Sequence, residues 1–334
     1  MMKHKNARFY IAAFTSAVFL LLCSLWTALV FGAADTSMLD VWAALAWDVK
    51  TDTVTMIREI RLPREIAAIF TGAALSAAGA IMQGMTRNPL ADPGLLGLTA
   101  GANTALVLTL GMIPAAGYFT LTAASFIGAA LGVLLVFSIG ARRKGGYSPL
   151  RLVLAGAAVS AFLYGISEGA SLYFKISKEA SMWTAGGLIG STWEQLGLMV
   201  PFIVIGLVLS LILSRQLTIL SLSEEVAAGL GQKTAAIKAL LLLSVILLAG
   251  AAVALAGNLA FVGLMVPHIA RMAVGANYRY ILPMSALAGG SFMLLADTLA
   301  RTINAPYETP LYAIVSLLGL PFFLYIVHRG RKTI

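Results

Sequence analysis

Of the 334 residues, 60% are hydrophobic and 11% are charged, and the mean hydropathy is +0.91. A soluble domain carries roughly 25% charged residues, so this composition excludes an ordinary water-soluble globular protein. The net charge of +9 does not indicate nucleic-acid binding, because the basic clusters at 142–144 and 329–332 flank apolar runs, as membrane anchors do. The single cysteine, Cys23, lies inside an apolar run and excludes an intrachain disulfide.

About ten apolar segments follow one another along the chain, separated by short polar connections. In lipid the backbone N–H and C=O groups must be paired, which leaves helices or a closed barrel. Barrel strands alternate apolar and polar residues, whereas segments 202–213 and 239–256 do not alternate. We therefore predict an all-α polytopic membrane protein with about ten transmembrane helices, at 8–33, 63–84, 94–112, 117–140, 150–174, 197–215, 238–257, 259–274, 281–303 and 311–328.

The distribution of charge predicts how these helices are oriented. The first apolar run, 9–31, is longer than a signal peptide requires, so we expect a retained helix. With the N-terminus in the cytoplasm, 16 of the 23 Lys and Arg residues and 3 of the 14 acids fall on the cytoplasmic side. This bias follows the positive-inside rule. We expect residues 1–334 to form a single transmembrane domain, with both termini and a coupling loop, 216–238, in the cytoplasm.

Arginines gather where this topology places the outside. Arg61 and Arg64 precede the second span, and Arg301 lies at the external end of the ninth. Cations at a helix N-terminus oppose both the macrodipole and the positive-inside bias. The residues alone leave two interpretations open. The arginines dock an acidic partner from outside, or they neutralise local acids at i, i+4 spacing, Arg61 with Glu65 and Arg301 with Asp297.

Few ionisable groups lie within the predicted spans. Glu168 is in the fifth span, and a charged group at membrane depth usually faces a cavity or a partner. A position near the external mouth would lower the cost of its charge. Glycines also recur at four-residue spacing, in the pairs 97/101, 128/132 and 165/169, which predicts close packing of helices.

The cytoplasmic loop 216–238 contains a predicted short helix. Ser223 is its expected N-cap, and the next two residues are acids, which are favoured in a first helical turn. Such a helix on the membrane surface suits docking of a partner, whereas the plain alternative is an ordinary connecting helix. The residues that we assign to this element are Ser223, Glu224, Glu225, Ala228, Gly229, Leu230 and Gly231.

The sequence contains no recognisable catalytic constellation. The P-loop pattern Gly-x-x-x-x-Gly-Lys-Ser/Thr is absent, so the chain has no P-loop with which to bind ATP. The three histidines, His4, His268 and His328, form no metal-binding pattern. We expect a protein that is not an enzyme and holds no cofactor or metal of its own, with ATP bound by a partner subunit.

Several strings stand out between Arg61 and Ile326. They are Arg61-Leu62-Pro63-Arg64, Gly79-Ala80-Ile81-Met82-Gln83, Asn88-Pro89-Leu90-Ala91-Asp92-Pro93-Gly94-Leu95-Leu96-Gly97, Phe261-Val262-Gly263-Leu264-Met265-Val266-Pro267-His268, Leu282-Pro283, Leu295-Ala296-Asp297 and Glu308-Thr309-Pro310. Together they resemble the permease family of iron(III)–siderophore and cobalamin ABC importers, and residues 1–60 contribute little to the resemblance.

This resemblance implies a ten-helix, inverted-repeat permease subunit of the type II importer class. Two such subunits, identical or related, would form one pore in the cytoplasmic membrane of a prokaryote. Two cytoplasmic ATPase subunits and an external substrate-binding protein would complete the importer. Iron(III)–siderophore is the implied cargo.

The resemblance also assigns roles to individual residues. The positions that receive acidic residues of the binding protein match Arg61, Arg64 and Arg301. Segment 223–231 would dock the ATPase. The fifth span would line the pathway and its cytoplasmic gate, which are assigned to Glu168, Tyr147 and Ser148.

Three other functions are alternatives to an iron(III)–siderophore permease. A cobalamin or haem permease would have the same architecture with a different cargo. An ion-coupled secondary transporter would need ion ligands within the membrane, for which only Glu168 and Asp297 are available. A purely structural scaffold would not explain the external arginines or the set of motifs.

Overall fold

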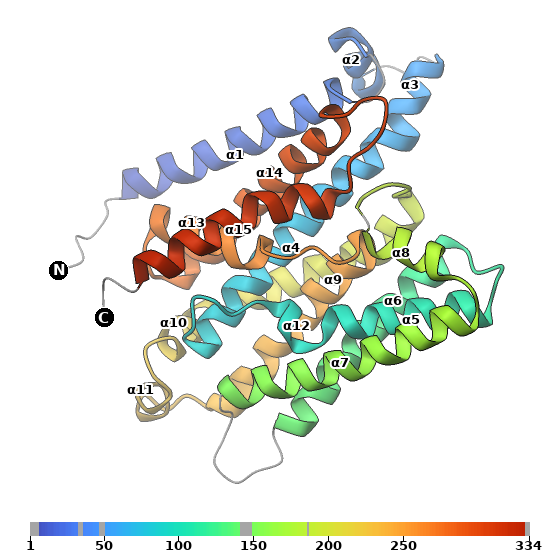
Figure 1. Ribbon diagram of the computed structural model, residues 1–334. Helices are drawn as coiled ribbons and strands as arrows, with labels where there is room; N and C mark the ends of the chain where they lie inside the picture. The colour runs from blue at the N-terminus through green and yellow to red at the C-terminus, as the bar shows by residue number, and fades with distance from the viewer. Residues whose placement is uncertain (1–6, 33–35, 47–50, 141–148, 186, 331–334) are drawn as a thin grey trace.

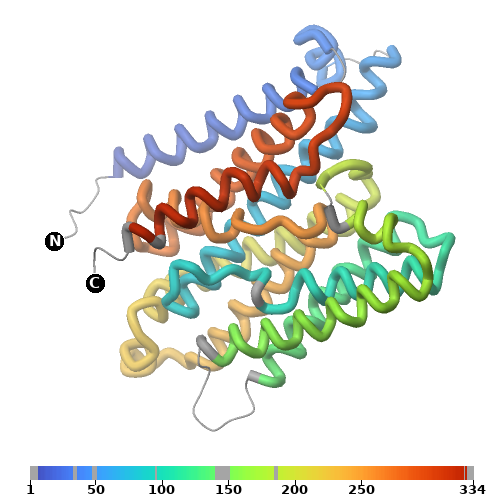
Figure 2. The backbone as a smooth tube through the Cα atoms, viewed as in Figure 1, coloured from blue at the N-terminus to red at the C-terminus, as the bar shows by residue number. Residues whose placement is uncertain are grey.

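A computed structural model describes residues 7–32, 36–46, 51–140, 149–185 and 187–330, which are helical between short turns and contain no strand. Figures 1 and 2 show the long helices side by side in one bundle. In chain order the elements are α1 (Ala7–Val30), α2 (Met38–Ala46), α3 (Asp52–Met56), η1 (Ile57–Arg61), α4 (Leu62–Thr86), η2 (Pro93–Leu96), α5 (Leu98–Met112), α6 (Tyr118–Gly140), α7 (Pro149–Tyr173), α8 (Ser177–Ala185), α9 (Trp193–Ile212), α10 (Ser214–Leu220), α11 (Glu224–Gly229), α12 (Thr234–Ala256), α13 (Val262–Val274), α14 (Tyr278–Thr302) and α15 (Leu311–Gly330).

Seven helical stretches in the described part of the chain are long and apolar enough to cross a membrane. They are α1, the continuous stretch from Asp52 to Thr86 that includes α4, and α6, α7, α9, α12 and α14. Helices α5, α13 and α15 are also apolar but run for only 10–17 residues in their apolar parts. An all-helical protein with several membrane-capable helices is therefore confirmed, whereas the count of ten crossings stays a prediction.

The two ends of the bundle carry different elements. The start of α1, the end of α15 and the short helices α10 and α11 lie at one end (Figure 1), which we call the α11 end. Helices α2, α3 and α8 lie at the opposite end, which we call the α2 end. The connection from α4 to α5 lies toward the α11 end, and the connection from α14 to α15 lies at the α2 end (Figure 1).

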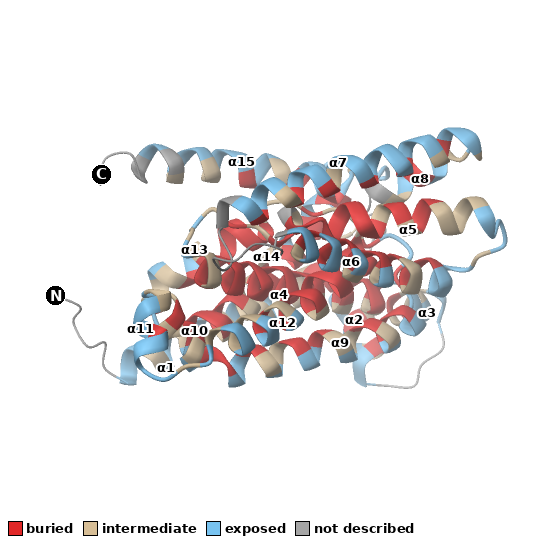
Figure 3. Ribbon diagram, turned by 90° about the horizontal axis from the view of Figure 1, so that it is seen from below, coloured by how far each residue is buried: buried red, intermediate tan, exposed pale blue. Residues whose placement is uncertain are grey.

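Helix α4 forms the centre of the core, and buried residues concentrate around it and α14 (Figure 3). Its small residues let neighbouring backbones approach closely. A Cβ on Gly72 would overlap the carbonyl of Gly289 in α14, and one on Gly79 would overlap the carbonyl of Gly263 in α13. Without a hydrophobic effect between helices in lipid, such close packing is a main source of cohesion.

Two of the three predicted glycine pairs also serve helix packing. Gly97 and Gly101 face Gly132 and Gly128 between α5 and α6, where an added Cβ would meet backbone. At the third pair, Gly165 and Gly169 in α7, an added Cβ would meet no atom of another described element within 4 Å. Helix α7 is accordingly among the more exposed helices of the bundle (Figure 3).

Candidate functional site

The arginines predicted at the external side lie together at the α2 end of the bundle, inside the protein. We call Arg61, Arg64 and Arg301 with their acidic neighbours Glu65, Asp297 and Glu308 the arginine cluster. The three arginines are only 3–9% exposed, and Glu65 and Asp297 are fully buried. Elements from both halves of the sequence, η1 and α4 with α14 and the α14–α15 connection, bring the cluster together.

Arg64 is held by two carboxylates. Its Nε donates to Asp297 Oδ2 at 3.0 Å, and its Nη2 donates to Asp297 Oδ1 at 2.9 Å. Its Nη1 and Nη2 donate in parallel to Glu308 Oε1 and Oε2, at 2.8 and 3.0 Å. Planar, two-point contacts of this kind are among the strongest hydrogen bonds in proteins.

Arg301 joins the same network from α14. Its Nε lies 3.0 Å from Asp297 Oδ2, so the predicted Arg301–Asp297 pair is present. Its Nη2 donates to Glu65 Oε1 at 2.6 Å, a pairing between residues 236 positions apart. Removing one partner from a buried ion pair leaves an uncompensated charge, so each member depends on the others.

The end of α1 supplies further acceptors. Arg61 Nη1 donates to the carbonyl oxygen of Leu29 at 2.7 Å and to the hydroxyl of Thr36 at 2.7 Å, and Arg301 Nη2 donates to the carbonyl of Ala28 at 3.2 Å. The last carbonyls of a helix have no partner in the helix and carry its negative dipole end. The arginines therefore stabilise the end of α1. Neither arginine lies at a free helix N-terminus, because Arg61 is inside the continuous helical stretch from Asp52 to Thr86 and Arg301 is in the last turn of α14.

The burial of these arginines bears on the predicted docking site without testing it. Binding of a partner needs groups that the partner can reach, and the described side chains of the cluster are already paired within the chain. Sequence reasoning assigned no role to Glu308, which lies 244 positions from Arg64. Its signal in the sequence was the string Glu308-Thr309-Pro310, which contributes to the family resemblance but does not indicate a partner for the acid.

The short helix predicted within 216–238 is α11, and its cap is the predicted one. The hydroxyl of Ser223 accepts from the backbone N–H of Val226 at 3.0 Å. Hydrogen bonds from its own backbone N–H and from the Ser223 side chain lower the pKa of the exposed Glu225 carboxyl. Glu224 pairs with Lys238 of α12 at 2.6 Å, so the loop helix is tied to the start of a long helix.

Helix α11 and its flanks present apolar side chains to solvent. Leu222, Val226 and Leu230 are 69%, 44% and 65% exposed. Val226 and Leu230 lie one turn apart on one face, Leu222 is exposed just before the N-cap, and we call the three residues the exposed stripe. On the other side, Ala227 is fully buried against the bundle. The remaining assigned positions, Ala228, Gly229 and Gly231, are exposed as well.

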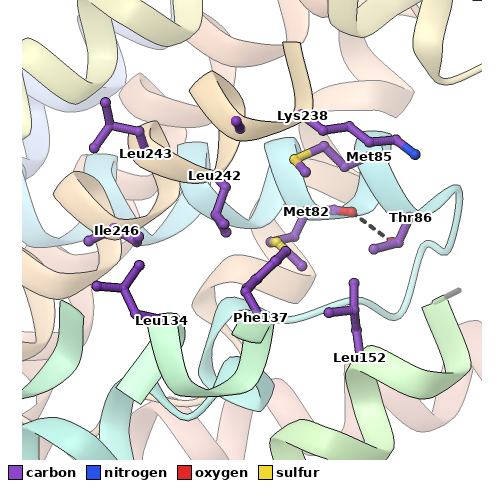
Figure 4. A pocket seen from close by; sticks show the side chains of 11 residues that line it. Met82, Met85, Thr86, Leu134, Phe137, Leu152, Lys238, Leu242, Leu243 and Ile246 are labelled. Carbon is purple, nitrogen blue, oxygen red and sulfur yellow. Dashed lines mark hydrogen bonds between the residues drawn. The ribbon is translucent and has the colours of Figure 1, made fainter. Parts of the chain in front are cut away.

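A cavity lies directly beside the point where α11 meets α12. It has a volume of about 330 Å³ and lies between α4, α6, α7 and α12. Figure 4 shows Met82, Phe137 and Leu242 around it, with Lys238 at its edge. The walls are almost entirely apolar, so the space is suited to movement of side chains and not to holding water.

The predicted pathway residues are only partly described. Glu168 is exposed on α7, one position from Ser167, whose hydroxyl accepts from Asn103 at 2.8 Å. Tyr147 and Ser148 lie outside the described residues. A second cavity of about 520 Å³ lies between α7, α12, α15 and the connections that precede α5 and α13, and its polar lining includes Ser160, Tyr164 and Asn258. Sequence reasoning did not single out these three for the pathway, because single polar residues in apolar helices are common.

The comparisons with known proteins agree with one another. The model of the FecCD transport family matches residues 19–329. The iron(3+)-hydroxamate import system permease protein FhuB of Bacillus subtilis is 44% identical over 302 residues, which cover 90% of this chain and 79% of that protein. The hemin transport system permease protein HmuU of Yersinia pestis is 38% identical over 313 residues, 91% of this chain and 93% of that protein.

A solved structure has the same fold over nearly the whole chain. It is an inward-facing conformation of a protein described as a metal-chelate type ABC transporter. The TM-score is 0.83 at 28% identity, over 94% of this chain and 98% of that one.

Proposed function

Because this chain belongs to the FecCD transport family, we propose that it is the permease subunit of an ABC importer that moves iron(III)–siderophore complexes across the cytoplasmic membrane of a prokaryote. The observation that carries the proposal is the match of family, relatives and fold over almost the whole chain. Transport would be powered by ATP bound to a separate subunit, so the permease itself would need no cofactor.

The proposed topology places the α11 end in the cytoplasm and the α2 end outside. All ten apolar helices would cross the membrane as one domain of residues 1–334, including the shorter α5, α13 and α15. The connections after α4 and after α14, at opposite ends of the bundle, support an inverted repeat of the type II importer class (Figure 1). The start of α1 and the end of α15 at the α11 end support cytoplasmic termini.

A second permease subunit, identical or related, would complete the pore. Helix α7 supports this assembly, because Phe162, Leu172 and Tyr173 on it are exposed and Gly165 and Gly169 face open space. A small-residue stripe with large apolar neighbours is a typical surface for packing between membrane helices. The pathway would then run along α7 and the 520 Å³ cavity, past Glu168 and the gate at Tyr147 and Ser148.

The ATPase subunits would dock on the loop helix α11 within 216–238. The exposed stripe of Leu222, Val226 and Leu230 supports this role, since an amphipathic helix in a groove is a common docking mode. ATP-driven displacement of α11 would reach α12 through the Glu224–Lys238 pair. The adjacent apolar cavity gives the start of α12 room to respond.

An external binding protein would deliver the cargo at the arginine cluster. Arginine is favoured for two-point contacts with carboxylates, which supports an acidic docking face. The same cluster disfavours an ion-coupled transporter. Asp297, one of the two acids available as an ion ligand, is fully buried between Arg64 and Arg301 and is therefore already neutralised.

Uptake of labelled cargo tests the function directly. Cells with and without the chain are given radiolabelled iron on hydroxamate, catecholate and citrate carriers, and also labelled hemin and cobalamin. We expect loss of uptake for one ferric siderophore in the deletion strain, restored by the wild-type gene. Loss for hemin alone would favour the second candidate, a haem permease, which the relative from Yersinia pestis supports. Unchanged uptake of every compound would contradict the proposal.

A further inference from the structure

Within the arginine cluster, Glu308 differs from the other two acids in its accessibility. The side chains of Glu65 and Asp297 are fully buried, whereas that of Glu308 is 28% exposed. Glu308 is also the only one of the three that comes from a connection and not from a long helix. An approaching group that seeks Arg64 therefore meets Glu308 first.

Glu308 occupies one of the two edges of the Arg64 guanidinium that can bind a carboxylate at two points. It accepts from Nη1 and Nη2 in parallel, at 2.8 and 3.0 Å, while Asp297 accepts from Nε and Nη2 on the inner side. These contacts use four of the five N–H groups, so the guanidinium has no two-point site left for a further carboxylate. A fourth carboxylate could not simply be added, because it would approach the three acids already present.

We propose that docking on this permease is an exchange of carboxylates, in which an acidic side chain of the external binding protein takes the place of Glu308 on Arg64. In the undocked permease, Glu308 therefore makes the contacts with Arg64 that the acidic side chain of the partner makes after docking. The inference rests on the proposed function, which supplies the binding protein, and it identifies the residue that must leave for the partner to bind.

The exchange would release the connection from α14 to α15. In segment 303–310 the side chains of Ile303 and Tyr307 are exposed, and Glu308 ties the segment to α4. Helix α15 follows at Leu311, and its Phe323 lies 6.3 Å from the ring of Phe261 and lines the 520 Å³ cavity. Loss of the Glu308 contact would therefore act on a helix that borders the proposed pathway.

Affinity for the binding protein tests the exchange. The exchange predicts that removal of the Glu308 charge strengthens binding, whereas a structural defect would weaken it. The probe is the binding protein whose deletion abolishes uptake of the same cargo, and the permease is the full importer complex in lipid nanodiscs. Glu308→Gln removes the competing charge, so we expect tighter binding by on the order of tenfold, mostly through slower dissociation. Glu308→Asp should stay near the wild type.

Glu59→Gln is the matched control. Glu59 is an exposed acid in η1 at the same end of the molecule, so its removal changes the charge of the docking face by the same amount. We expect less than about a twofold change for it. An affinity for Glu308→Gln that is unchanged, weaker, or improved no more than for Glu59→Gln overturns the exchange while leaving the importer intact. Failure of the wild-type complex to bind the probe overturns both the exchange and the proposed docking.

A second measurement does not depend on how well Glu308→Gln folds. In a Cys23→Ala background, Tyr307→Cys carries a spin label on a side chain that is 74% exposed. Addition of the binding protein should increase the mobility of the label or shift its distance to a second label on α4. A spectrum that stays unchanged at saturating binding protein overturns the exchange.

Discussion

At the residue scale, Arg61 and Arg301 cap the C-terminal end of α1, a helix to which neither belongs, by donating hydrogen bonds to its last carbonyls. The sequence predicts Arg61 at a helix N-terminus, where a cation is unfavourable, but the helix is continuous from Asp52 to Thr86 and Arg61 lies inside it. In the folded protein these side chains reach the last carbonyls of α1, where a cation is favoured. Whether a helix dipole favours or disfavours a charged side chain therefore depends on which helix end the charged group reaches, and not on the helix that carries the residue.

Among the acids of the cluster, Asp297 is the one whose replacement should lower the stability of the protein most, because two buried arginines pair with it. Asp297→Asn should destabilise the permease by about 3–5 kcal/mol, the usual cost of breaking a buried ion pair from one side. The measurement is the midpoint of heat-induced loss of monodisperse protein in detergent. Asp52→Asn, at an exposed acid in the first turn of α3, is the control and should unfold like the wild type. Equal midpoints for the two variants would contradict the central role of Asp297.

Sequence spacing predicted one contact of this cluster but not the arrangement of the rest. The pair Arg301–Asp297 followed from helical spacing within one segment. The contacts of Arg64 with Asp297 and of Arg301 with Glu65 join residues more than 230 positions apart, and no local pattern encodes them. The burial of these side chains could not be predicted either, because a predicted span gives the depth of a residue in the membrane but not the helices that surround it.

At the scale of elements, α11 shows what local pattern can predict. Its cap, its acidic first turn and its glycine end are all short-range features, and the predicted helix is present. The tie to Lys238 and the exposed stripe with Leu222 depend on how the loop packs on the bundle. Sequence spacing alone could not decide which face of so short a helix is buried.

The exposed stripe of α11 gives a second mutational prediction. Val226→Glu combined with Leu230→Glu places charges on the apolar surface, so the ATPase should no longer co-purify and uptake should fall to background. The amount of permease in the membrane should not change, because both side chains are exposed. Lys233→Glu alters the net charge of the same loop equally, outside the stripe, and should retain uptake. Co-purification of the ATPase with the double variant would rule out this docking surface.

At the scale of the whole molecule, the ten apolar segments and the helical class were predictable because hydropathy is a property of each segment alone. Segment lengths were less well predicted, since α5 and α13 are short helices beside breaks in the chain. The breaks at Asp92–Gly97 and Gly257–Phe261 use turns and positive φ angles whose depth in the membrane depends on tertiary packing. Such non-helical backbone is tolerated in a membrane where protein surrounds it.

Orientation in the membrane follows from the charge bias and is directly testable. In the Cys23→Ala background, a membrane-impermeant thiol reagent should label Tyr307→Cys in intact cells. In cells that lack the ATPase subunits, Leu230→Cys should react only in inverted vesicles, because α11 is expected in the cytoplasm. Both side chains are well exposed, so access within the protein does not limit the reaction. Labelling of Leu230→Cys from outside would reverse the assigned topology.

The long sequence separation within the arginine cluster sets an order of events during synthesis. Arg64 and Asp297 are 233 positions apart, which at 5–20 residues per second is a delay of roughly 10–50 s. Throughout that interval α4 is already made, yet Arg64 and Glu65 lack the partners that neutralise them in the finished protein. These two charges therefore stay without those partners until α14 and the following connection have been synthesised, so completion of the arginine cluster depends on the ninth predicted span.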